Sequence, residues 1–241
     1  MKRIAVFRKV LASNDALARA QREQLDAAGV LGINIMSAPG SGKTSLVERT
    51  VTALKRDYRI QVIEADIQGD LDARRVARLG VECVQINTQG DCHIDSLMLQ
   101  SVLPQLLRSS DFELRHSDFP KLLLVENVGN LVCPAEFQLP THYNVTILSV
   151  PEGSDKPVKY PLMFLKSDIL LINKVDLLPY VDFDFRQLGR ALKRIKPELP
   201  ILRISTKTGQ GLDRWLSWLR AKLKTTRSIH RFHRFRRLES V

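Results

Sequence analysis

A loop of small residues between an apolar strand and a helix constrains this chain more than any other stretch: NIMSAPGSGKTSL, residues 34–46. It fits the pattern Gly, four residues, Gly-Lys-Ser/Thr, except that Ser37 stands at the first glycine position. Gly40 and Gly42 let backbone N–H groups approach phosphate oxygens, and the following helix points its positive dipole end at the same anion. We expect Lys43 to reach the β- and γ-phosphates and the Thr44 hydroxyl to bind Mg²⁺. The predicted phosphate-binding residues are Ser37, Gly40, Ser41, Gly42, Lys43, Thr44 and Ser45.

Strand and helix patterns alternate along the rest of the chain. Apolar runs typical of buried parallel strands occur at 32–36, 59–65, 81–87, 121–127, 144–150, 168–173 and 200–206. Helical patterns occur at 13–28, 43–56, 70–80, 95–108 and 211–223. In the last of these, Leu212, Trp215, Leu216 and Leu219 have the spacing of a buried face. This succession predicts an α/β fold with a doubly wound, mostly parallel sheet.

The segment NKVD, residues 173–176, follows the strand DILLI and is typical of proteins that recognise guanine. The Asp176 carboxylate accepts from guanine N1–H and from its N2 amine, a donor pair that adenine lacks. We expect the Lys174 stem to lie over the base and Asn173 to tie this loop to the phosphate loop. Ser205 and Lys207 follow another strand, where a second base-contacting loop belongs. These elements in this order favour GTP over ATP.

Glu126 ends the strand LLLVE, and Gly129 lies three residues beyond it. Glu126 is predicted to hold Mg²⁺ and the Gly129 N–H to meet the γ-phosphate. Lys43, Thr44, Glu126 and Gly129 are therefore the predicted catalytic residues. Asp66, which ends the strand VIEAD, is either a further Mg²⁺ ligand or an ordinary loop aspartate. Because Asn130 replaces the glutamine that orients water in faster GTPases, slow turnover near ~10⁻⁴ s⁻¹ is expected.

Two of the three cysteines lie in loops beside other candidate residues. Cys92 and His93 follow one strand, and Cys133 lies four residues beyond Gly129. Two thiolates and an imidazole suit Zn²⁺ or Ni²⁺. From spacing alone, buried apolar thiols are the commoner alternative, and Cys83 inside a strand fits that alternative.

Four segments together resemble the hydrogenase nickel-incorporation GTPases, the HypB family: ENVGNLVCPAEF, NTQGDCHID, EGSDKPVKYP and NKVDLLPY. The resemblance covers nearly the whole chain and implies a P-loop GTPase of the metallochaperone type. Cys92, His93 and Cys133 would then be the Ni²⁺ or Zn²⁺ ligands. They would lie near the interface of a homodimer that forms on GTP binding. The family delivers nickel to the large subunit of [NiFe]-hydrogenase, alongside a small nickel- and zinc-binding accessory protein.

The resemblance leaves some alternatives open. Urease accessory GTPases share the nucleotide motifs but not the two cysteine loops, and nickel insertion into urease is the alternative function. A binding module in which nucleotide turnover is irrelevant is another. The N-terminus MKRIAVFRK has neither a cysteine motif nor a histidine-rich stretch, so nickel storage is not expected.

Composition sets the remaining expectations. No apolar run reaches the ~18 residues of a membrane span, and the N-terminus is too charged for a signal peptide, so a cytoplasmic protein without membrane contact is expected. Three domains are predicted: an N-terminal helical extension (1–30), a GTPase domain with the metal site (31–225) and a basic, disordered tail (226–241). The net charge is +11, and five arginines lie in the tail. A nucleic-acid contact there is the less favoured interpretation.

Overall fold

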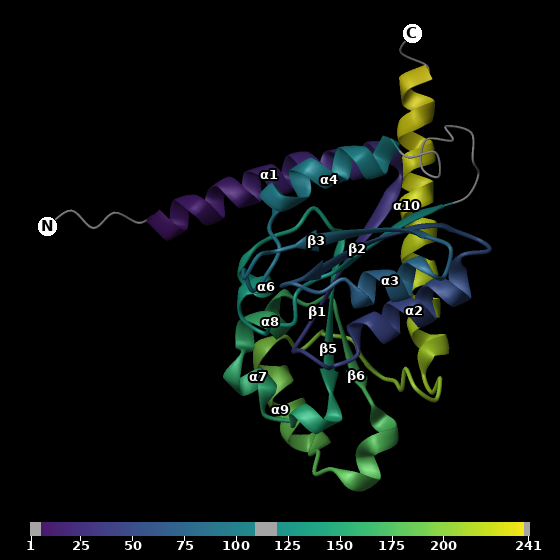
Figure 1. Ribbon diagram of the computed structural model, residues 1–241. Helices are drawn as coiled ribbons and strands as arrows, with labels where there is room; N and C mark the ends of the chain where they lie inside the picture. The colour runs from purple at the N-terminus through teal and green to yellow at the C-terminus, as the bar shows by residue number, and fades with distance from the viewer. Residues whose placement is uncertain (1–5, 109–119, 239–241) are drawn as a thin grey trace, which may run out of the picture.

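The computed structural model describes the backbone of residues 6–108 and 120–238, and the side chains of residues 8–108 and 120–226. Within these ranges, seven parallel strands form one sheet in the order β3-β2-β4-β1-β5-β6-β7. Figure 1 shows the helices packed around this sheet. The strands are β1 (Val30–Ser37), β2 (Arg59–Asp66), β3 (Glu82–Asn87), β4 (Lys121–Glu126), β5 (Tyr143–Ser149), β6 (Ile169–Asn173) and β7 (Ile201–Arg203). The main helices are α1 (Val6–Ala28), α2 (Lys43–Leu54), α3 (Leu71–Ala77), α4 (Ser96–Arg108), α9 (Phe185–Ile195) and α10 (Leu212–Leu238). Shorter ones are α6 (Cys133–Glu136), α7 (Lys156–Lys159), α8 (Pro161–Lys166) and the 3₁₀ turns η1 (Val150–Glu152) and η2 (Val175–Tyr180).

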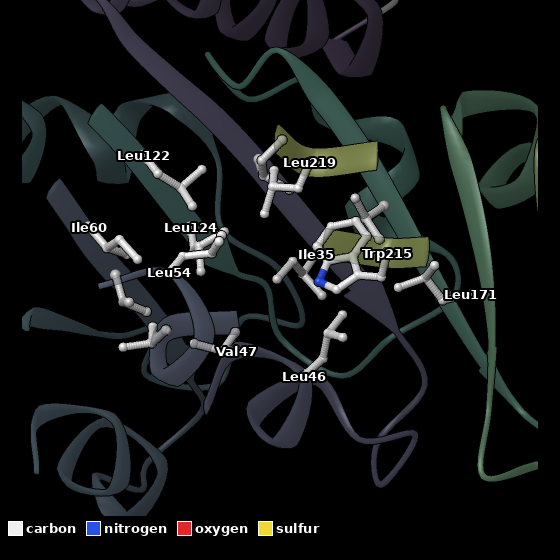
Figure 2. Packing of buried hydrophobic residues seen from close by; sticks show 14 of the residues in the cluster. Ile35, Leu46, Val47, Leu54, Ile60, Leu122, Leu124, Leu171, Trp215 and Leu219 are labelled. Carbon is white, nitrogen blue, oxygen red and sulfur yellow. The ribbon is translucent and has the colours of Figure 1, made fainter. Parts of the chain in front are cut away.

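One face of the sheet is covered by α2, α3 and α10. Figure 2 shows Trp215 and Leu219 of α10 packed with Ile35 and Leu46 in this layer. Trp215 is fully buried, and its Nε1–H donates to Thr50 Oγ1 at 2.9 Å, so its one polar group keeps a partner. The amphipathic pattern predicted around Trp215 is therefore core.

The opposite face is covered by two groups of helices. Apolar residues of α1 and α4 pack over β2 and β4, and those of α8 and α9 pack over β5 and β6. Along β4, Leu122 and Leu124 face α2 and α10, whereas Leu123 and Val125 face α1 and α4. Both faces of the strand are buried, which explains its continuous apolar run. The predicted doubly wound α/β fold is confirmed.

The strand order reverses at β1, which has β4 on one side and β5 on the other. In open sheets of this kind, ligands bind outside the carboxyl ends of the strands at the reversal. The phosphate loop leaves β1 at this point, Glu126 ends β4, and Asn173 ends β6. The topology thus gathers segments that are distant in the sequence at one edge.

Both ends of the chain differ from the sequence prediction. α1 begins at Val6 rather than near Ser13, so Asn14 lies inside the helix, where its side chain makes tertiary contacts. α10 continues to Leu238, beyond the helical pattern predicted over 211–223 and into the predicted tail. No glycine or proline occurs within either helix to end it earlier. Residues 1–5 and 239–241 of the predicted extension and tail lie outside the described ranges.

In the portion that the structure describes, no helix combines the length and the apolar character that crossing a membrane requires.

Candidate nucleotide and metal sites

The phosphate loop joins β1 to α2 in a conformation that requires glycine. Gly40 and Gly42 have φ values of 72° and 101°, in the left-handed region that strains other residues. A Cβ on Gly42 would lie 2.5 Å from Asn173 Nδ2, so this glycine also makes room for the base-binding loop. α2 begins at Lys43, which puts the loop at a helix N-terminus suited to an anion.

Lys43 is the cation of this loop. Its side chain is largely buried, and Nζ donates to Ser37 Oγ at 3.3 Å. Burial lowers the pKa of Lys43, while nearby carboxylates, Glu126 foremost, act in the opposite direction. A bound phosphate would add negative charge beside Nζ and would favour the charged ammonium.

Thr44 and Glu126, the two predicted Mg²⁺ ligands, are in direct contact. Thr44 Oγ1 donates to Glu126 Oε1 at 2.7 Å. Glu126 Oε2 is buried without a hydrogen-bond partner, and burial raises the pKa of this carboxyl group to about 7. A divalent cation would give Oε2 a partner and favour the ionised form, so these oxygen donors fit Mg²⁺.

A second group of acids adjoins Thr44 and Glu126. Ligand oxygens of Glu64, Asp66 and Asp72 lie within 4.8 Å of one another. Of the three, only Asp66 is predicted from the sequence. Glu64 is 2% exposed, and burial together with the nearby Glu126 raises its pKa to about 8. Its signal in the sequence is a carboxylate between Ile63 and Ala65, inside a strand whose inner residues are all buried, and such residues are seldom buried without a role.

A cavity of about 470 Å³ opens between the phosphate loop and these acids. Its volume lies within the usual range of small-molecule sites. It is lined by Pro39, Gly40, Gly42, Lys43, Thr44, Ser45, Glu64, Ala65, Asp66, Ile67, Asp72, Arg75, Glu126, Asn127, Val128, Gly129, Lys174 and Thr206. The predicted nucleotide-binding residues that do not line it are Ser37, Ser41, Asn173, Asp176, Ser205 and Lys207.

Gly129 lies directly against the phosphate loop. A Cβ at this position would be 2.9 Å from the Pro39 N and Cα atoms, so no larger residue fits without displacing the loop. The segment that follows Glu126 is thus held beside the predicted position of the terminal phosphate.

The base-binding loops are joined to the phosphate loop by hydrogen bonds. Asn173 Nδ2 donates to Ser41 O at 2.8 Å, which is the link expected from the sequence, and Lys174 Nζ donates to Gly40 O at 2.7 Å. Asp176 Oδ1 accepts from Ser205 Oγ at 2.6 Å, which orients the carboxylate.

Arg49 has a role in this region that no sequence motif indicates. Its guanidinium donates to the main-chain oxygens of Thr206 and Lys207 at 2.9 and 3.0 Å and so ties the second base loop to α2. Lys207 contributes its main-chain oxygen to this contact.

Cys92, His93 and Cys133 come together at the same edge of the sheet. Their ligand atoms lie within 4.8 Å of one another, and the two Sγ atoms are 2.7 Å apart with both cysteines free. The His93 ring stacks on Phe137 with centroids 3.9 Å apart, which fixes its plane. Three ligands leave one coordination position open for a further donor.

The protonation states at this site respond to burial. Burial lowers the pKa of His93 and favours the neutral imidazole that binds metals. Burial and the neighbouring Cys92 raise the pKa of the Cys133 thiol to about 11. A bound cation would counter that effect and favour the thiolate. Cys83 lies apart, packed against the core with its pKa raised to about 12 by burial, as expected for a structural thiol.

Residues 31–203 match the family model described as "CobW/HypB/UreG, nucleotide-binding domain". A curated relative from Azotobacter vinelandii, "Hydrogenase maturation factor HypB", is 43% identical over 216 residues, which cover 90% of this chain and 68% of the relative. The chain belongs to the HypB family of hydrogenase maturation factors.

Other HypB proteins extend the comparison. "Hydrogenase/urease maturation factor HypB" from Helicobacter pylori strain J99 is 36% identical over 232 residues, which cover 96% of this chain and 93% of that relative. The crystal structure of HypB from Helicobacter pylori in complex with nickel has a TM-score of 0.81 at 36% identity, covering 88% of this chain and 96% of that one. HypB from Archaeoglobus fulgidus has a TM-score of 0.79 at 37% identity, covering 88% of this chain and all of the other.

Proposed function

We propose that this HypB-family chain is a GTP-hydrolysing metallochaperone that binds Ni²⁺ or Zn²⁺ and assists nickel insertion into the [NiFe]-hydrogenase large subunit. One observation carries the proposal. The segment from Glu126 to Cys133 begins at a predicted Mg²⁺ ligand, passes Gly129 beside the phosphate loop and ends at a predicted metal ligand. The nickel-bound HypB structure from Helicobacter pylori supports the choice of cargo.

The nucleotide chemistry follows from the geometry of the cavity. Lys43 and the N-terminus of α2 would hold the phosphates, and Gly129 would sit at the γ-phosphate. Mg²⁺, when bound, would neutralise charge on the phosphate oxygens. Thr44 and Glu126 would hold it, with Asp66 as a further ligand from β2. Asp176, oriented by Ser205, would select guanine.

Loss of the γ-phosphate would release Gly129, and the seven residues from Asn127 to Cys133 leave little slack to absorb the shift. Pro134 follows Cys133 with a fixed φ. We therefore expect Cys133 to move relative to Cys92 and His93. Because metal–ligand distances tolerate only ~0.2 Å of error, such a shift would change metal affinity. By linkage, bound metal changes nucleotide affinity by the same factor.

The test measures the metal content of the purified protein and its affinity for Ni²⁺ and Zn²⁺. Each is measured with GDP bound and with a non-hydrolysable GTP analogue bound. Different affinities in the two states are expected. If Ni²⁺ and Zn²⁺ each bind with the same affinity in the GDP state as in the GTP-analogue state, the proposed switch is contradicted. A turnover assay with a Lys43→Ala control separates a GTPase from a binding module.

The remaining proposals concern location and partners. We propose a cytoplasmic protein that dimerises on GTP binding and works with a small nickel- and zinc-binding accessory protein. Sedimentation that stays monomeric with a GTP analogue would contradict the dimer. Hydrogenase is named for both curated relatives above, and urease only for the one from Helicobacter pylori. Loss of hydrogenase rather than urease activity in a deletion strain would separate the two targets.

A further inference from the structure

Asn127 lies between the predicted Mg²⁺ ligand Glu126 and the segment that leads to Cys133, and its side chain makes three hydrogen bonds. It is fully buried. Its Nδ2 donates to Asn34 Oδ1 at 3.3 Å, and its Oδ1 accepts from the N–H of Ile94 at 3.2 Å and of Val128 at 2.9 Å. These bonds join β1, the loop that carries Cys92 and His93, and the segment that leads to Cys133.

Ile94 directly follows His93, so its N–H is one residue from a predicted metal ligand. Cys133 is reached from Asn127 along the main chain. Both halves of the metal site therefore connect to one residue that adjoins Glu126. The main-chain N–H of Asn127 donates to Ile35 O at 3.0 Å, which continues the sheet hydrogen bonding beyond β4.

The β1 end of this network is fixed. Asn34 Nδ2 donates to Asn144 Oδ1 at 3.0 Å, so side-chain amides run from Asn127, just beyond β4, through β1 to the half-buried Asn144 of β5. A buried donor or acceptor that loses its partner costs roughly 1–3 kcal/mol. A displacement of Asn127 must therefore carry Ile94 with it or break a buried bond.

We propose that Asn127 is the positioning residue that transmits the state of the nucleotide site to the metal-binding loop, through the bond from the Ile94 N–H to Asn127 Oδ1. The inference rests on the proposed function, since it names the route of the proposed nucleotide–metal coupling. Cys133 responds along the chain, and His93 responds through this hydrogen bond.

Asn14 of α1 offers a matched contrast. Its Nδ2 donates to Gln138 O at 2.9 Å, and its Oδ1 accepts from Ser96 N–H at 2.8 Å. It therefore links the same two segments at positions that follow His93 and Cys133 in the chain, rather than at positions beside Glu126. Asn14 holds the ligands together without contacting the segment beside Glu126.

The experiment measures the affinity of the full chain, purified free of metal, for Ni²⁺ alone and for Zn²⁺ alone. Each titration is done with GDP and with a non-hydrolysable GTP analogue, and the result is the ratio of the two affinities. A uniform loss of affinity cancels in this ratio. Couplings of this kind are typically about 5–150-fold. In Asn127→Ala, the ratio is expected to fall to about one. In Asn14→Ala, affinity falls in both states and the ratio is unchanged.

Two further variants keep the test decisive if Asn127→Ala does not fold. Asn127→Ser keeps an oxygen beside the Val128 N–H but is too short to reach Ile94. Its affinity ratio should therefore also fall to about one. Asn127→Asp keeps both acceptor bonds, so its affinity ratio should stay at the wild-type value. A wild-type ratio in Asn127→Ala or Asn127→Ser, or a ratio of one in folded Asn127→Asp, overturns the role of Asn127. A ratio of one in the wild type overturns the coupling itself, and this route with it.

Discussion

The proposed phosphate site and the proposed metal site differ in what holds their side chains. Lys43 begins α2, Glu126 ends β4, and both side chains are at least nine-tenths buried. Cys92 and His93 lie in a loop between β3 and α4, and Cys133 begins a helix of four residues, all three partly exposed. The phosphate site is thus built on the ends of regular elements, whereas the metal site is built on the loops beside them.

In the proposed switch, this difference predicts a different part for each site. Groups at the ends of buried strands and helices keep their geometry before a ligand arrives, and loop-borne groups move at lower cost. A small change at the phosphates is therefore expected to appear as a larger change in metal geometry. The predictions below test whether the two sites can be separated in this way.

The largest effect is expected from Lys43→Ala. Removing a buried, charged phosphate contact should weaken GTP binding by about 100-fold or more and abolish turnover. Because Lys43 does not contact the cysteine loops, Ni²⁺ affinity without nucleotide should stay unchanged. Calorimetric titration of both ligands checks this. A comparable loss of metal binding would show that the two sites are one unit.

The converse variant is Cys133→Ala. Loss of one of three ligands should weaken Ni²⁺ and Zn²⁺ by at least ~100-fold, more than the loss of an outer partner does. GTP affinity of the metal-free protein should be retained. Cys83→Ala is the matched control, since that thiol packs against the core. If Cys83→Ala lowers metal affinity as much, the assigned ligand set is wrong.

Asp176→Asn tests the predicted recognition of the guanine base. The side-chain amide N–H of the new asparagine can donate to the xanthine carbonyl, so preference should move from GTP to xanthosine triphosphate. The affinity for GTP should fall by about 100-fold. Ser205→Ala should give a smaller loss, because it removes only the hydroxyl that orients Asp176. Competition binding measures both. Undiminished preference for GTP in Asp176→Asn would refute the base-site assignment.

The smallest effect concerns the attachment of α1, which supports the metal loops through Asn14. His142 Nδ1 accepts from Gly32 N–H at 2.9 Å, and Nε2 lies 2.8 Å from Asp26 Oδ1, so His142 joins α1 to β1. Burial and the nearby Arg22 lower the pKa of His142, although Asp26 opposes this. The folded protein thus keeps the imidazole neutral at a pH where the unfolded chain protonates it.

Stability should therefore decrease as the pH falls through the ordinary histidine value of 6.5. His142→Gln should reduce this pH dependence, whatever its effect on stability at neutral pH. Denaturant unfolding at pH 7.5 and 5.5 measures the difference. If the free energy of unfolding falls by the same amount between pH 7.5 and 5.5 in both proteins, His142 does not contribute to the pH dependence.

Features that depend on neighbouring residues could be predicted from the sequence. The phosphate loop, the buried strands and the segment NKVD are each contiguous, and their chemistry depends on residues a few positions apart. The start of α1 and the end of α10 were not predicted correctly, because helix boundaries depend on weak local preferences that tertiary contacts override. The contacts of Asn14 with Ser96 and Gln138 are one example.

The sequence by itself determined that this chain forms a parallel α/β sheet with a guanine-type nucleotide motif. Only the tertiary structure decided which distant residues meet. It brings Cys92 within reach of Cys133 across 41 positions, places Glu64 beside Glu126, and sets Asn127 against Ile94. The physical reason is the sheet: β2, β3 and β4 all end at one edge, so the side chains that follow them converge there whatever their separation in the chain.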